Sequence, residues 1–291
     1  MGMLAFGHTL TAQELYVATE PASNMAARSF ALRLNNKLML MQQDTSLRFR
    51  NKLDLMFGLS KKLMVHASVM ASDVYTGTYR VEGGSLYAKY RFFSKDEVHS
   101  HLRMAAFGRF SYITNPPAYQ TSYTYFIDHG SGPVEHTGVK GHVAGDIDLD
   151  GNNAGWETGL VVTQLKHRLA VSSSVAFVKV MANAGYSRLS AQPRYGLQYT
   201  ASAGYLLLPK EYVNYRQTNV NLYAELVGMV LDGRKGSYAD FAPAVQFIFN
   251  SIARLDIGAQ LNVWNNVHRM GTQRYLVRLE YNFLNAFKKK K

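Results

Sequence analysis

LRFRNKLDLMFGLS, residues 47–60, alternates apolar and polar side chains along most of its length. Successive side chains of a β-strand point to opposite faces, so this pattern places one face in an apolar medium and the other in a polar one. The apolar face, interrupted at Asn51, carries Leu47, Phe49, Leu53, Leu55, Phe57 and Leu59. The opposite face carries Arg48, Arg50, Lys52, Asp54 and Ser60, a charge density that is rare over a soluble core.

The same alternation recurs along the whole chain. Most of these segments are about nine residues or longer, which suits tilted strands that cross a bilayer and exceeds the usual soluble strand. With residues 47–60 they give about twelve strands, and ten to fourteen are compatible with the pattern. The other segments are 30–34, 63–71, 86–92, 102–112, 156–164, 169–177, 197–207, 220–228, 241–249, 253–263 and 275–283.

Short and long connections alternate between these segments, as in outer-membrane barrels. Both termini then lie on the short-turn side, and the connection from Thr114 to Ala154 becomes one long extracellular loop. Closure of the sheet removes every unpaired edge, which a sheet in lipid requires. The sequence therefore predicts an all-β fold, an antiparallel transmembrane β-barrel in the bacterial outer membrane.

Composition excludes several other classes of protein. The 291 residues carry a net charge of +12 with 18% charged residues and contain no cysteine. Disulfide scaffolds, thiolate zinc sites and cysteine nucleophiles are thus excluded. The basic residues alternate singly with apolar ones and form no patch, which argues against nucleic-acid binding. The 19 Tyr and 15 Phe suit the aromatic girdles of a membrane barrel.

The chain divides into four parts. Residues 1–13 resemble the end of a signal peptide, and residues 14–28 form a periplasmic or lumen-facing segment. Residues 29–284 form the barrel, and residues 285–291 are a basic tail. The expected partners are outer-membrane lipid, the barrel-assembly machinery that reads the last strand, and an outer-membrane or periplasmic protein. The segment around Pro21 could dock such a partner or plug the lumen.

The polar strand faces define a lumen with more basic than acidic groups, which would favour anions. We therefore expect passive or gated passage of small anionic solutes. The alternative is a non-conducting barrel that acts as a scaffold or as a subunit of a larger complex, with Phe93, Phe107, Tyr223 and Trp264 as inward bulk. The basic set is Arg33, Arg48, Arg50, Lys52, Lys89, Arg91, Arg103, Arg109, Arg254, Arg274 and Arg278. The acidic set is Asp54, Glu157, Glu225, Asp240, Asp256 and Glu280.

Within the long loop, one segment has the spacing of a calcium-binding loop. Carboxylates at positions 1, 3 and 5, Gly151 at position 6 and a glutamate at position 12 match the EF-hand pattern. The candidate calcium ligands are Asp146, Asp148, Asp150, Asn152 and Glu157. The alternative is an Asp-rich solvated turn, and we expect no other cofactor.

Two weaker constellations lie on one strand. Met64, His66 and Met70 share a face and could hold copper, although methionine more often fills irregular packing. His66 and Ser68 could belong to a hydrolase, but no third member of a triad is evident. We expect no enzymatic activity.

Two segments carry a family resemblance. Residues 14–25, ELYVATEPASNM, and residues 150–155, DGNNAG, resemble a little-characterised group of Bacteroidetes-type outer-membrane barrel proteins. The resemblance implies a location and a fold. It implies neither a substrate nor a catalytic residue.

Overall fold

The computed structural model describes residues 19–128, 130, 132–211, 216–232 and 236–287. The predicted signal peptide and the last four lysines lie outside this range. The described residues form the strands β1 (Ser29–Met41), β2 (Leu47–Gly58), β3 (Leu63–Ser72), β4 (Arg80–Asp96), β5 (Ser100–Ile113), β6 (Tyr119–Asp128), β7 (Pro133–His142), β8 (Gly155–Lys166), β9 (Leu169–Val180), β10 (Tyr195–Leu208), β11 (Asn219–Leu231), β12 (Ser237–Phe249), β13 (Ala253–Asn265) and β14 (Gly271–Phe283).

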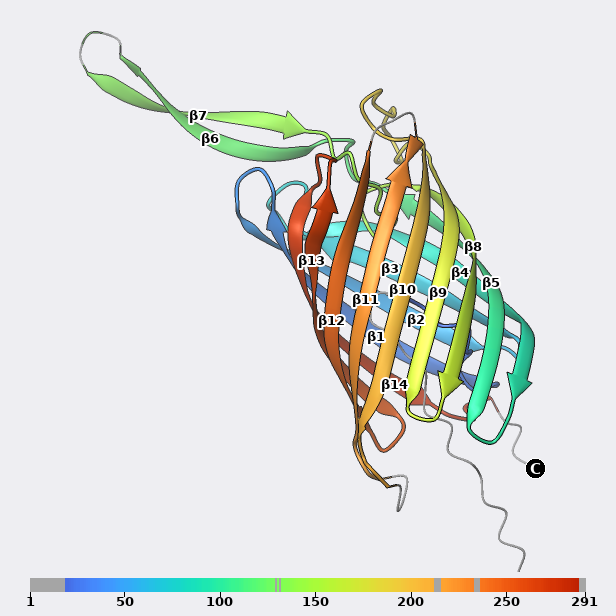
Figure 1. Ribbon diagram of the computed structural model, residues 1–291. Helices are drawn as coiled ribbons and strands as arrows, with labels where there is room; N and C mark the ends of the chain where they lie inside the picture. Colours follow the sequence, from blue (N-terminus) through green and yellow to red (C-terminus); the bar gives the residue numbers. More distant parts are fainter. Residues whose placement is uncertain (1–18, 129, 131, 212–215, 233–235, 288–291) are drawn as a thin grey trace, which may run out of the picture.

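Twelve of these strands close into one barrel of antiparallel neighbours, in which β1 pairs with β2 and β14 (Figure 1). β5 pairs directly with β8, because β6 and β7 form a separate two-stranded sheet. The predicted barrel of about twelve strands is confirmed. The β6–β7 hairpin lies inside the segment that was predicted to be loop.

The two faces of the wall differ as the alternation predicts. On β2, Leu53 and Leu55 are 44% and 40% exposed, whereas Arg50 and Asp54 are 1% and 3% exposed. Exposed Leu, Val, Phe and Tyr side chains continue around the outer face of the barrel. Such an apolar band is the surface that a barrel presents to lipid. Among the described residues, no helix is long and apolar enough to cross a membrane.

The barrel has two distinct ends. Tight turns at residues 59–62, 97–99, 167–168 and 250–252 mark the turn end, where β14 also ends (Figure 1). The opposite, loop end carries the β6–β7 hairpin, which projects sideways from the barrel (Figure 1).

Two of the side chains that were predicted to point into the lumen point outward instead, because each follows or adjoins a β-bulge. Phe93 is 40% exposed and Trp264 is 58% exposed, so neither constricts the lumen. The pairing register shifts between Arg91 and Phe93 and again between Ala239 and Asp240, opposite Trp264. A bulge adds one residue to a strand, so it reverses the alternation on which the prediction depended.

The connection between β5 and β8 divides into two parts. The β6–β7 hairpin leads outward, and residues 143–154, here called the inner loop, turn back into the barrel mouth. Ile147 and Leu149 of the inner loop are 4% and 2% exposed. They pack in a cluster with Val178, Met229 and Tyr238 of the wall. Part of the predicted extracellular loop therefore lies within the lumen.

The sheet closes where β1 meets β14. In this register Arg33 lies opposite Glu280, and Asn35 lies opposite Arg278. Arg33 Nε lies 2.7 Å from Glu280 Oε2, and Arg278 Nε donates to Asn35 Oδ1 at 2.7 Å. We call these two contacts the seam pairs.

Candidate functional site: the lumen

At the turn end, residues 19–23 lie inside the barrel. The Lys89 ammonium donates to the carbonyl oxygens of Pro21 and Ser23, at 2.5 and 2.8 Å. The Ala22 amide donates to Thr163 Oγ1 at 2.9 Å. These bonds anchor the backbone of this segment to β4 and β8. The segment therefore occupies the turn end of the lumen.

Glu20 joins the same segment to the wall. Its carboxylate lies 2.5 Å from Arg33 and 3.8 Å from the Lys89 ammonium. Burial alone would raise the pKa of Glu20, but the cations of Arg33 and Lys89 hold it well below its usual range. Glu20 is consequently a fixed negative charge inside the barrel.

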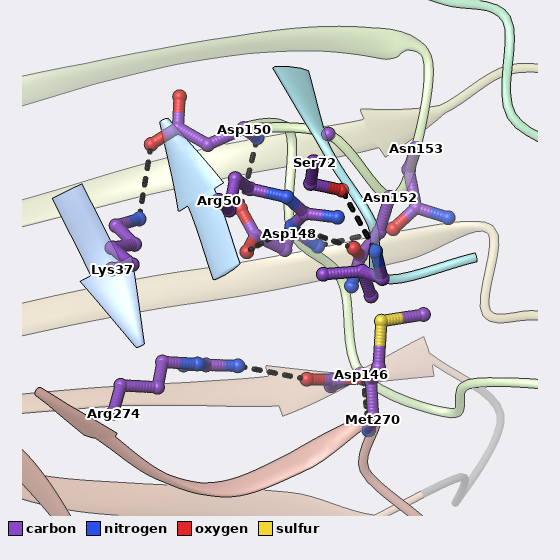
Figure 2. Close-up of polar contacts among 12 residues, drawn as sticks. Lys37, Arg50, Ser72, Asp146, Asp148, Asp150, Asn152, Asn153, Met270 and Arg274 are labelled. Atoms are coloured by element: carbon purple, nitrogen blue, oxygen red, sulfur yellow. Dashed lines mark hydrogen bonds and ion pairs between the residues drawn. The ribbon is translucent and has the colours of Figure 1, made fainter. Parts of the chain in front are cut away.

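At the loop end, three cations gather on Asp150 of the inner loop. Lys52 Nζ and Arg109 Nη1 each lie 2.8 Å from Asp150 Oδ1, and Lys37 Nζ lies 3.6 Å from Oδ2. Figure 2 shows Lys37 reaching from β1 toward this carboxylate. Burial works to raise the pKa of Asp150, but Lys52, Arg109 and Lys37 hold it well below its usual range.

Arg50 holds the middle of the inner loop. It donates to Asn152 Oδ1 at 2.9 Å and lies 3.7 Å from the Asp148 carboxylate (Figure 2). On its other side it pairs with Glu82 at 2.8 Å, and both of these side chains are almost fully buried. Asp148 also accepts a hydrogen bond from the Asp150 amide at 2.8 Å. The loop is therefore braced by its own backbone as well as by the wall.

Asp146 anchors the start of the inner loop to β14 and to the β13–β14 connection. Its carboxylate lies 3.3 Å from Arg274 and 3.6 Å from Arg269 (Figure 2 shows the Arg274 contact). Arg269 in turn pairs with Asp240 at 2.6 Å. The alternate residues Asp146, Asp148 and Asp150 thus contact different cations around the barrel.

Between the inner loop and the N-terminal segment lies a cavity of about 270 Å³. Six basic and five acidic side chains line it, so its charge is close to balanced. The basic ones are Arg33, Lys37, Lys52, Arg109, Arg274 and Arg278. The acidic ones are Glu20, Asp54, Asp148, Asp150 and Glu157.

The predicted lumen residues fall into three groups. One group lines the cavity: Arg33, Lys52, Arg109, Arg274, Arg278, Asp54 and Glu157. A second group is buried in the barrel outside the lining of this cavity: Arg50, Lys89, Arg254, Glu225, Asp240, Asp256 and Glu280. The third group lies toward the barrel ends. There Arg48 pairs with Asp44, Arg91 donates to the Lys61 carbonyl, and Arg103 pairs with Asp96.

Lys37, Glu20 and Arg269 take part in this network but were not among the predicted lumen residues. Lys37 continues the alternation of Arg33 and Asn35, so a longer first strand would have included it. Glu20 and Arg269 lie outside any alternating segment, and no sequence pattern points to them. The acids of the inner loop and of the N-terminal segment change the charge balance on which the anion preference was predicted.

Three of the predicted calcium ligands form ion pairs with basic side chains. Asp146 and Asp150 contact arginine and lysine, and Glu157 pairs with Arg109 at 2.8 Å. Within the described part of the chain, no group of three or more His, Asp or Glu side chains is placed to hold a metal ion. Calcium binding by this loop therefore stays a prediction, and the geometry gives the same carboxylates another role.

The β3 constellation is part of the inner packing. Ser68 Oγ donates to Asp54 at 2.6 Å, and the His66 ring lies 4.9 Å from the ring of Tyr87. Met64 and Met70 are 2% and 0% exposed, and Met70 packs in a cluster with Ile113. Ser68 is thus a hydrogen-bond donor to an acid of the lumen wall, and the two methionines are buried packing residues.

Comparison with known proteins supports the fold. No protein-family model and no curated protein matches the sequence. An outer membrane channel from Pseudomonas putida F1 is similar in structure with a TM-score of 0.50 and 12% identity, covering 92% of this chain and 100% of that chain. The NanC porin gives a TM-score of 0.46 at 10% identity, covering 87% and 98% of the two chains. The KdgM porin gives 0.45 at 11% identity, covering 86% and 98%.

These similar structures are outer-membrane porins and channels. The protein has the fold of an outer-membrane β-barrel, and its apolar outer face suits lipid. The predicted location in the bacterial outer membrane is confirmed. The resemblance to a Bacteroidetes-type group stays a prediction.

Proposed function

We propose that the protein is a gated channel for small anionic solutes, closed in this conformation by the inner loop and by residues 19–23. The observation that carries the proposal is the convergence of Lys37, Lys52 and Arg109 on Asp150. These three cations belong to the barrel wall, whereas the carboxylate belongs to a loop. Withdrawal of the inner loop would leave the wall with an excess of positive charge.

Electrostatics supports the anion preference in the open state. Unpaired charge that lines a water-filled pore raises the local concentration of the opposite ion. In the closed state that excess is cancelled by Asp148 and Asp150. The gate and the selectivity of the channel thus depend on the same residues.

A non-conducting scaffold is the second candidate. It is supported by the occupation of the barrel from both ends, through Lys89 at the turn end and Arg50 at the loop end. Buried ion pairs of this kind resist disruption, because removing one partner leaves an uncompensated charge. A barrel held closed in this way could serve as a subunit of a larger assembly.

Conductance in a planar bilayer distinguishes the two candidates. The purified full chain is compared with the double variant Lys37→Gln, Lys52→Gln and with a control, Lys62→Gln, at an exposed turn. We expect voltage-dependent or intermittent channels that prefer anions. The double variant should lose most of this preference, and the control should keep it.

Silence from protein that is shown to be folded and inserted would overturn the channel proposal and favour the scaffold. Channels whose ion preference is the same in the double variant would overturn the assignment of selectivity to these lysines. Circular dichroism and heat-modifiable gel mobility would verify the folded barrel in each case.

A further inference from the structure

The site around Asp150 is built like a binding site for an external carboxylate, although a side chain of the protein occupies it. Lys37 comes from β1, Lys52 from β2 and Arg109 from β5, and all three reach the same carboxylate. Arginine and lysine that converge from a rigid wall are the usual means of binding carboxylates.

We infer that the cluster of Lys37, Lys52 and Arg109 binds a carboxylate of a small organic acid, which enters by displacing Asp150. This inference rests on the proposed channel function and names the solute class and the gating step of that site. Asp150 is then a built-in competitor of the solute.

The charges at the cluster favour this exchange. Besides Asp150, Lys52 lies 3.6 Å from Asp54, and Arg109 lies 2.8 Å from Glu157. Without Asp150, these two carboxylates face three cations. One negative charge is then missing, and a solute carboxylate supplies it without leaving a buried cation unpaired.

The exposure of Asp150 is compatible with exchange for a solute carboxylate, and its three cations distinguish it from Asp148, which is 19% exposed and lies 3.7 Å from Arg50. The Asp150 and Lys37 side chains keep 20% and 25% of their surface, whereas those of Arg50 and Glu82 keep 2% and 1%. Asp150 and Lys37 also line the central cavity of about 270 Å³. This volume is close to the lower bound of about 300 Å³ for ligand pockets, so it suits a small organic acid.

Exchange couples binding to opening. A solute that occupies the cluster removes the strongest attachment of residues 148–150 to the wall. Because the solute binds only the form in which Asp150 has left, its apparent dissociation constant is raised by the rarity of that form. Removing the competing charge should therefore tighten binding as well as release residues 148–150 from the wall.

Calorimetric titration of the full chain in detergent with citrate tests this inference. The variants are Asp150→Asn and the control Asp128→Asn, which makes the same change in charge on the projecting hairpin. We expect Asp150→Asn to bind citrate about ten-fold more tightly than the natural chain. Asp128→Asn should match the natural chain.

A second variant tests the cations. Lys37→Gln and Lys52→Gln, added to Asp150→Asn, should raise the dissociation constant for citrate by about ten-fold or more. Equal citrate affinity in Asp150→Asn and the natural chain would overturn the inference. Equal affinity for citrate and for chloride at the same ionic strength would also overturn it, because the site would then lack carboxylate selectivity.

Conductance separates the failure of this inference from the failure of the proposed function. If the natural chain forms channels but Asp150→Asn binds citrate no more tightly, the channel proposal stands and the competition between Asp150 and the solute is refuted. If Asp150→Asn binds citrate more tightly but no variant forms channels, the carboxylate site stands and the channel proposal is refuted.

Discussion

The β6–β7 hairpin and the inner loop belong to one excursion of the chain and have opposite surroundings. In the hairpin, Tyr123, Phe126 and Val134 are exposed, and the two strands pair only with each other. In the inner loop, Ile147 and Leu149 are buried, and the neighbouring acids contact the barrel wall. The part of the excursion that enters the barrel is thus the part whose acids meet cations of the wall and whose apolar residues join a cluster of the wall.

The largest expected effect comes from breaking the anchor of the inner loop. Asp146→Asn leaves Arg269 and Arg274 short of a counter-ion in a site where Asp146 is 1% exposed. Because removing one partner of a buried pair is costly, we expect a loss of about 3 kcal/mol in the free energy of unfolding. Urea unfolding in detergent micelles measures it. Asp128→Asn on the hairpin should change the value by less than about 0.5 kcal/mol, and a similar loss in both variants would refute the contrast.

An intermediate effect is expected from acid. The pKa values of Asp148 and Asp150 are lowered in the folded protein, by cations that outweigh the effect of burial. Their contribution to stability is therefore complete above the ordinary aspartate pKa of about 3.9 and is lost as the pH falls through the lowered values. The inner loop should stay closed from pH 7 to about pH 4 and open progressively below that, as the pH falls toward the lowered pKa values. Single-channel recordings across this range test it; opening that is already complete at pH 5 would contradict it.

The smallest effect is expected from shortening the hairpin. Tyr123 and Gly138 are partners in its register, so residues 124–137 can be replaced by an Asn-Gly turn that joins them. Because this part of the hairpin pairs only with itself, we expect the melting temperature to shift by less than about 2 °C and conductance to stay the same. A marked change in gating would show that the hairpin and the inner loop act together.

The barrel could be predicted from sequence because its signal is local. Alternation over a few residues, as between Leu53, Leu55 and their polar neighbours, reports which face meets lipid. The predicted orientation of Phe93 and Trp264 was wrong because a single extra residue in a bulge reverses the alternation, and no sequence pattern indicates the bulge.

The site could be predicted only in part, because its partners lie far apart in sequence. Arg109 and Lys52 were expected in the lumen, but no local pattern says that Asp150 meets them. Asp146, Ile147, Asp148 and Leu149 alternate in the same way as the strands do, with an acidic and an apolar face. That alternation, beside a wall with excess positive charge, is the signal that could have placed the inner loop inside. The same residues also predict a calcium site, because the spacing of the carboxylates matches the EF-hand pattern.

The seam pairs also bear on how the barrel is assembled. β1 and β14 are the first and last strands, so their pairing completes the cylinder. A slip of one residue would turn charged side chains toward lipid, and a slip of two would separate Arg33 from Glu280 and Asn35 from Arg278. Only the native alignment satisfies both pairs. The two seam pairs therefore favour closure of the barrel in the correct register, because a shifted alignment of β1 and β14 would lose both contacts.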